Sequence, residues 1–184
     1  IPFWALDLKY PTRVDASGPK RDAERTPTEM LTSFDFPAND KRGPIKLHWS
    51  QERGGPAILK EKGLNLKGAN TLFIGSKGML LTGFGSLKLF PEKSFANFKA
   101  PEKFIPDSPG FYKEWTEACK GGEPATCNFD YSGPLSETVL LGNTAYRAGG
   151  GFDWDADTLT ATGNESAKPL LHSEFRKGWE EFTS

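Results

Sequence analysis

Short apolar runs, each closed by Gly, Pro, Asn or Asp, fill residues 11–90 of the 184-residue chain. Runs of this length predict strands, because a helix would show an apolar repeat over about 10 residues or more. Turn residues at both ends of the runs favour pairing between neighbours, so we expect a largely antiparallel sheet. The predicted strands cover residues 12–16, 31–36, 45–50, 71–75, 79–83 and 87–90.

The run at 45–50 has a period of two. Ile45, Leu47 and Trp49 are apolar, and the residues between them are polar. This alternation is expected of a strand with one buried and one polar face. His48 should therefore point away from the apolar side.

A hairpin is predicted at 71–83, where Ser76, Lys77 and Gly78 separate two apolar runs. Glycine supplies the positive φ that a tight turn requires. The stretch 51–70, which contains turn signals and several lysines, is expected to be a long loop.

Helical signals lie on both sides of the predicted sheet. Residues 1–9 are predicted to be the end of a buried helix that stops before Pro11. After a proline-spaced connector, we expect helices from a cap at Ser108 to Gly121, at 132–147 and at 165–179. The predicted fold class is α+β, an open-faced and largely antiparallel sheet followed by C-terminal helices. Its segments are a helix tail at 1–10, a sheet domain at 11–107 and C-terminal helices at 108–184.

Apolar periodicity assigns a buried face to each predicted helix. It places Cys119 in the core, and it places Gly142 where two elements approach closely. The stripes are Phe111, Trp115, Ala118 and Cys119 in the first helix, Leu135, Val139, Gly142 and Tyr146 in the second, and Leu171, Phe175 and Trp179 in the third.

Composition excludes several classes of protein. The net charge of −1, without a block of like charges, disfavours nucleic acid and anionic membranes as partners. No apolar run approaches the roughly 18 residues of a membrane span. Two cysteines outside a C-x-x-C pair make a reducing compartment the default, which is the cytoplasm. Because the chain opens on Ile1 and an apolar run, we expect it to be part of a longer protein, and export of that parent stays open.

The recognisable motifs carry little chemistry. Gly83 and Gly85 resemble a nucleotide-binding turn, but a strand is expected after them where the phosphate-binding fingerprint needs a helix. Asp153, Asp155 and Asp157 alternate, yet the remaining positions of a calcium loop are not matched, so turns and helix caps explain them better. The two histidines have no partner at metal-ligand spacing, and no metal site is predicted.

The richest mixture of polar, titratable and aromatic side chains follows the third predicted strand. His48, Trp49 and Arg53 are the candidate substrate contacts, with Trp49 stacking on a sugar ring and the charged groups bonding its hydroxyls. A solvated strand end with Trp49 in the core is the alternative reading. The neighbouring members of the group are Lys46, Gln51 and Glu52.

Two stretches resemble the C-terminal end of a bacterial branch of the glucose-fructose oxidoreductase and inositol dehydrogenase family (Gfo/Idh/MocA). They are CNFDYSGPLSETVLLGNTAYRAG at 127–149 and EFRKGW at 174–179. The segments at 3–8, 75–81 and 111–122 resemble the same family in the same order. The resemblance covers nearly the whole chain, and its motifs are structural.

This resemblance implies an NAD(P)-dependent oxidoreductase that acts on a CH-OH group of a sugar or polyol. A Rossmann domain before Ile1 would bind NAD or NADP, and this chain would supply the substrate side and subunit contacts of a homo-oligomer. No Glu-Lys-Pro or Asp-x-x-x-His motif, which carry the family's acid-base groups, occurs in the chain. Catalytic and cofactor-binding residues are thus expected before Ile1, and the isolated chain is expected to be inactive.

Two further functions remain open at this point. A non-catalytic carbohydrate-binding or structural interaction module is compatible with 14 Phe and 5 Trp. A hydrolase with scattered carboxylates ranks third, since no paired-acid motif is present.

Overall fold

The computed structural model describes residues 1–22, 24–51, 56–65 and 68–179. The chain divides into two compact units. The first comprises residues 1–2 and 57–132, and the second comprises residues 3–56 and 133–184. The predicted segments 1–10, 11–107 and 108–184 concern a longer protein and stay a prediction.

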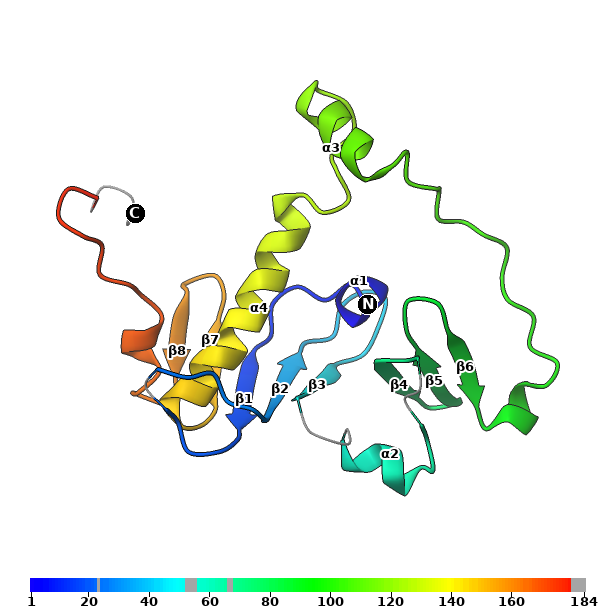
Figure 1. Cartoon of the computed structure of the whole chain (residues 1–184), viewed down its shortest axis with the longest axis horizontal. Helices are drawn as coiled ribbons and strands as arrows, with labels where there is room; N and C mark the ends of the chain where they lie inside the picture. The colour runs from blue at the N-terminus through cyan, green and yellow to red at the C-terminus, as the bar shows by residue number, and fades with distance from the viewer. Residues whose placement is uncertain (23, 52–55, 66–67, 180–184) are drawn as a thin grey trace. The chain divides into compact units, whose positions relative to one another are not determined.

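The second unit is built on a five-stranded sheet in the order β3-β2-β1-β7-β8, in which each strand is antiparallel to its neighbours (Figure 1). Helix α4 runs along this sheet. The strands are β1 (Arg13–Ser17), β2 (Met30–Phe36), β3 (Ile45–Gln51), β7 (Phe152–Asp155) and β8 (Thr160–Thr162), and the helices are α1 (Pro2–Ala5) and α4 (Phe129–Ala148).

One face of this sheet forms the core. Val14 of β1 pairs in register with Phe34 of β2 and with Phe152 of β7, so the three side chains share a face, and all three are buried. Helix α4 covers this face, because a Cβ at Gly142 would lie 3.0 Å from Phe34 Cζ. Trp154 Nε1 also donates a hydrogen bond to Glu137 of α4, at 2.8 Å.

The first unit holds a three-stranded antiparallel sheet in the order β4-β5-β6. Gly75 pairs with Gly78, so Ser76 and Lys77 form a two-residue turn. A Cβ at Gly78 would lie 2.4 Å from the carbonyl oxygen of Phe90, which only glycine avoids. The elements are α2 (Ala57–Glu61), β4 (Thr71–Gly75), β5 (Gly78–Thr82), β6 (Leu87–Phe90), the 3-10 helix η1 (Glu92–Phe95) and α3 (Phe111–Cys119).

The six predicted strands are confirmed, with bounds that shift by at most one residue at either end. The mixed α and β class with antiparallel sheets is confirmed as well. The close approach at Gly142 and the helix end at Gly149, which has a φ of 78°, are also as predicted.

Several helix predictions are wrong. Helix α1 ends at Ala5, not at residue 9, since the chain turns at Asp7 with a φ of 49°. The predicted loop at 51–70 contains α2. Between residues 165 and 179 the only helical segment is the 3-10 helix η2 (Lys168–Leu170), so the repeat of Leu171 and Phe175 does not build an α-helix. Strands β7 and β8 were not predicted at all.

The faces of two helices also differ from the prediction. Helix α3 has no buried residue, and Cys119 is exposed instead of lying in the core. It starts after Gly110, because the Ser108 hydroxyl bonds Glu114 Oε2 and the N–H of Gly110 without capping the helix. On α4 the buried residues are Pro134, Thr138, Leu141, Gly142 and Ala145, and Val139 is 57% exposed.

Candidate functional site

Two of the three predicted substrate contacts, His48 and Trp49, lie on β3, the strand at one edge of the five-stranded sheet. His48 and Trp49 are consecutive, so their side chains point to opposite faces of the sheet. Trp49 pairs in register with Thr32 on the face that α4 covers, and His48 pairs with Ser33 on the open face. Arg53 lies outside the described residues, as does Glu52. The structure therefore does not bring His48 and Trp49 together on one face.

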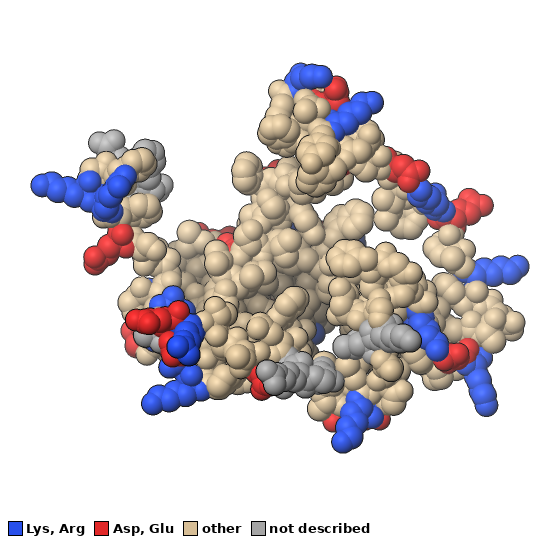
Figure 2. Space-filling view, viewed as in Figure 1, with Lys and Arg blue, Asp and Glu red and all other residues tan. Residues whose placement is uncertain are grey.

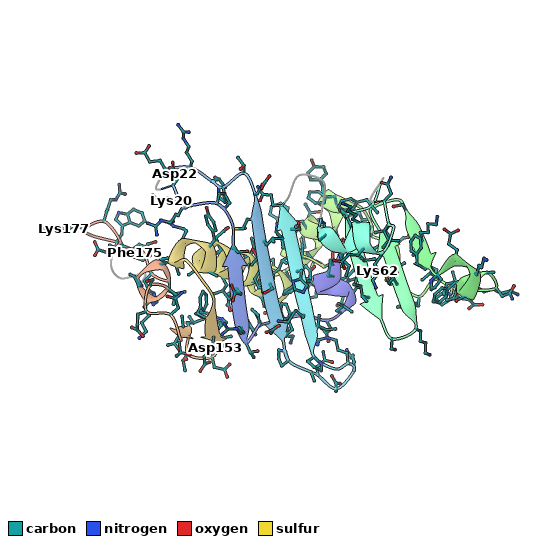
Figure 3. All side chains as sticks on the ribbon, turned by 90° about the horizontal axis from the view of Figure 1, so that it is seen from below. Lys20, Asp22, Lys62, Asp153, Phe175 and Lys177 are labelled. Carbon is teal, nitrogen blue, oxygen red and sulfur yellow. The ribbon has the colours of Figure 1, made fainter. Side chains whose placement is uncertain are left out.

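The open face beside His48 is polar. Lys46 forms an ion pair with Asp35, and Arg13 Nη1 donates to Asp153 Oδ1 at 2.8 Å. The hydrogen bond to Asp153 raises the pKa of Arg13 above its ordinary value. Register places Lys46, Asp35, Arg13 and Asp153 in one row across four strands, which ends at the Asp153 labelled in Figure 3.

The helix side of β3 is apolar. Ile45 and Leu47 are half-buried there, and Trp49 is 60% exposed. Thr32, next to Trp49, is buried, and its hydroxyl has no hydrogen-bond partner among the described residues. Trp49 is thus an accessible aromatic side chain and not a core residue. The alternative reading that placed it in the core is wrong.

The other polar members of the predicted group have structural partners. Gln51 Nε2 donates to the carbonyl of Pro27 at 3.4 Å, and Lys46 is held by Asp35. His48 is exposed, with only the hydroxyl of Ser33 opposite it across the strand pair. Trp49 is accordingly exposed, and among the described residues no hydrogen bond fixes its side chain.

The alternating acids at 153–157 behave as turn and sheet residues. Asp153 pairs with Arg13, and Asp155 Oδ1 accepts the N–H groups of Asp157 and Thr158. The bonds from Thr158 and Asp157 lower the pKa of Asp155. Within the described ranges, no group of three or more His, Cys, Asp or Glu side chains could hold a metal ion.

The glycine motif at 83–85 does not form a nucleotide cradle. Gly83 and Gly85 lie in the turn between β5 and β6, and Gly83 N donates to the carbonyl of Ser86 at 3.0 Å. A strand follows this turn, so no helix N-terminus is available to receive phosphates. The predicted reading of this motif as a turn is confirmed.

Comparison with protein-family models and with curated proteins finds no match to this chain. In the part of the chain that the structure describes, no helix combines the length and the apolar character needed to cross a bilayer.

Proposed function

We propose that this chain is the substrate-side portion of an NAD(P)-dependent oxidoreductase that acts on a CH-OH group of a sugar or polyol. The proposal rests on the resemblance to the Gfo/Idh/MocA family. In it, a Rossmann domain elsewhere in the protein binds NAD or NADP and supplies the catalytic residues. The chain binds the substrate, covers that domain and takes part in a homo-oligomer.

One observation supports the proposal most: helix α4 exposes apolar side chains on the side that faces away from the sheet. Leu141 and Ala145 are buried against the sheet, whereas Val139 and Leu140 on the outer side are 57% and 62% exposed, beside the polar Ser136 and Asn143. Figure 2 shows few charged side chains over this helix. Adjacent exposed apolar side chains mark a surface that contacts another protein surface. The outer side of α4 is therefore expected to be covered by a further protein surface.

Helix α3 in the first unit shows the same feature independently. Phe111, Tyr112 and Trp115 are exposed, and no residue of the helix is buried. Exposed apolar stripes on these helices are what a substrate-side domain presents when its nucleotide-binding domain is absent.

The turn at Gly83 and Gly85 does not fit NAD(P), since it leads into strand β6 and not into a helix. In the proposed reaction the chain therefore binds the sugar substrate and shields it from water. Trp49 offers a flat apolar surface to the C–H face of a sugar ring, and the covered face beside it excludes water.

The first test is the coding DNA upstream of Ile1, read in frame to its start codon. The proposal expects a Gly-x-Gly-x-x-Gly sequence, then Glu-Lys-Pro and Asp-x-x-x-His. A start codon a few residues upstream would overturn it and leave the interaction module as the better account.

The second test uses the full-length protein encoded by that reading frame. Trp49→Ala should raise KM for the sugar about tenfold, with a smaller change in kcat, since aromatic stacking contributes roughly 1 kcal/mol or more. An unchanged KM removes Trp49 from the substrate site. Trp4→Ala, at a tryptophan of α1 that is 59% exposed, is the matched control for loss of an indole.

The third test uses this chain alone. Leu140→Glu should reduce self-association and binding of an apolar dye, because it charges the uncovered side of α4. Leu159→Glu is the control, since Leu159 is similarly exposed in the β7–β8 turn. Equal effects of the two substitutions would contradict a specific covered face on α4. A stable monomer that binds sugar without nucleotide would favour the module instead.

A further inference from the structure

The first unit carries a hollow on one face of its three-stranded sheet. Phe73 of β4 pairs in register with Leu80 of β5, which pairs with Leu89 of β6, so the three side chains form one apolar row. Next to this row Gly75 and Gly78 lack side chains, which leaves a hollow of about 320 Å³. An apolar hollow of this size accepts one large side chain from another segment.

The two ends of the hollow differ in character. Phe95 of η1 closes one side, with its ring carbons 2.7 and 2.8 Å from the Cβ position of Gly78. Lys77, in the turn between β4 and β5, lines the rim. Its side chain is exposed and has no acidic partner among the described residues. The hollow is therefore an apolar receptor with one free positive charge at its edge.

The same unit contains a segment without helix or strand whose apolar side chains are largely exposed. Residues 96–110 are exposed throughout. Phe98 contacts Phe95 of η1 edge to face, whereas Phe104, between Pro101 and Pro106, is 81% exposed. Figure 1 shows this segment running from η1 to α3 without secondary structure. We call residues 96–110 the arm.

The arm carries an aromatic side chain and a carboxylate, which complement the apolar hollow and the lysine at its rim. Glu102 and Phe104 are two positions apart in the arm, and both are exposed. Lys103 is paired with Asp107 at 2.5 Å, whereas Glu102 has no basic partner among the described residues. The arm thus offers an exposed aromatic side chain and an exposed carboxylate two positions apart.

We propose that the arm of one copy of this chain binds the hollow of a second copy, with Phe104 in the hollow and Glu102 beside Lys77. Arm and hollow belong to the same unit, so each of two copies can place its arm in the hollow of the other. This reciprocal exchange has twofold symmetry and closes at a dimer. The proposal rests on the homo-oligomer included in the proposed function and names the contact that forms it.

The test measures the oligomeric state of the full chain by light scattering after gel filtration. We expect a dimer, and Phe104→Asp should weaken the dimer at least about tenfold, as expected for a buried aromatic anchor. Phe84→Asp is the matched control, because Phe84 is 95% exposed in the β5–β6 turn and belongs to neither surface. A dimer that survives Phe104→Asp refutes the arm, and a monomeric wild-type chain refutes the homo-oligomer as well.

Charge reversal tests the second contact. Lys77→Glu and Glu102→Lys should each weaken the dimer about two- to fivefold, as expected for an exposed ion pair. The double variant should restore it, because both chains then carry the reversed pair. If the double variant instead loses dimer affinity by the sum of the two single losses, Lys77 and Glu102 are not in contact.

A cross-link distinguishes exchange from folding back of the arm on its own hollow. One chain carries Phe104→Cys and a differently tagged chain carries Leu80→Cys, with Cys119 and Cys127 replaced by Ser in both. Under mild oxidation the proposal expects a disulfide between the two tags. A third chain carries both Phe104→Cys and Leu80→Cys. If this chain forms a disulfide within itself and the two singly substituted chains do not cross-link, the arm occupies its own hollow and the proposal is wrong.

Discussion

Thr32 and Thr138 are the buried polar residues among those the structure describes, and they differ in a way that predicts opposite effects of one substitution. The hydroxyl of Thr32 has no hydrogen-bond partner among the described residues. The hydroxyl of Thr138 donates to the carbonyl of Pro134 at 2.9 Å, one helical turn earlier. Both side chains lie in the second unit, at the contact between the sheet and α4.

Valine replaces the hydroxyl with a methyl group of similar size. At Thr32 this removes a buried and unsatisfied polar atom, whose desolvation costs about 1 to 3 kcal/mol, so Thr32→Val should stabilise the unit by about 1 kcal/mol or more. At Thr138 it removes a hydrogen bond that contributes roughly 0.5 to 1.5 kcal/mol, so Thr138→Val should destabilise the unit by that amount.

Urea unfolding followed by tryptophan fluorescence measures both effects. Trp154 is buried in the same core and reports on this unit. With a slope of about 2 kcal/mol per molar urea, the midpoint should rise by roughly 0.5 M for Thr32→Val and fall by a similar amount for Thr138→Val. Thr162→Val, on the exposed side of β8, is the control and should leave the midpoint nearly unchanged.

The result that refutes this reasoning is a lower midpoint for Thr32→Val. It would mean that the hydroxyl is bonded in the folded protein. The contact between β2 and α4 would then contain a polar partner, and the apolar description of this side of the sheet would be wrong.

Two further predictions concern the first unit. Gly78→Ala should destabilise the three-stranded sheet by about 1 to 3 kcal/mol in urea, because its Cβ would overlap the carbonyl of Phe90, whereas Gly85→Ala, with open space around it, should be nearly neutral. Hydrogen bonds from Thr126 and Ser108 lower the pKa of Glu114, so their stabilising effect is present above the unfolded pKa and is lost as the pH falls through the lowered value. A carboxyl NMR titration should show a higher pKa of Glu114 in Thr126→Val. The pKa should be unchanged in Thr116→Val, because the hydroxyl of Thr116 donates to the carbonyl of Lys113 and not to Glu114.

Local patterns predicted β1 to β6 because alternation and turn residues act over a few positions. The same signal was present in β7, where the buried Phe152 and Trp154 alternate with Asp153 and Asp155. The alternating acids also fit turns and helix caps, which is the interpretation that the sequence alone favours. Pairing with β1, which lies far away in the sequence, is what makes this stretch a strand.

Helical periodicity was a weaker guide, for a physical reason. It shows which face of a helix is apolar but not what covers that face, so the stripe that contains Phe111 and Trp115 predicts the helix correctly, whereas the core position predicted for Cys119 is wrong. At 165–179 the repeat has Pro169 near its start, and Phe175 is exposed instead of packing on another element; short helices need tertiary contacts to form.

For the site, the sequence predicts opposite directions for the side chains of His48 and Trp49, although it groups both as substrate contacts. Adjacent residues of a strand face opposite ways, so the sequence neighbours His48 and Trp49 cannot share one face of the sheet. The period of two already placed His48 away from Trp49, and the structure separates them as that pattern requires.

The pairing of β1 with β7 has a consequence for synthesis on the ribosome. Strands β1 to β3 emerge first, but β7 follows only after residues 57–132, which belong to the other unit. At about 5 to 20 residues per second, one edge of β1 waits unpaired for on the order of ten seconds. The strands β4 to β6 pair only with sequence neighbours and can close during that interval. The inserted unit is thus expected to fold before the unit that surrounds it, and the open edge of β1 is where a nascent chain would need a chaperone.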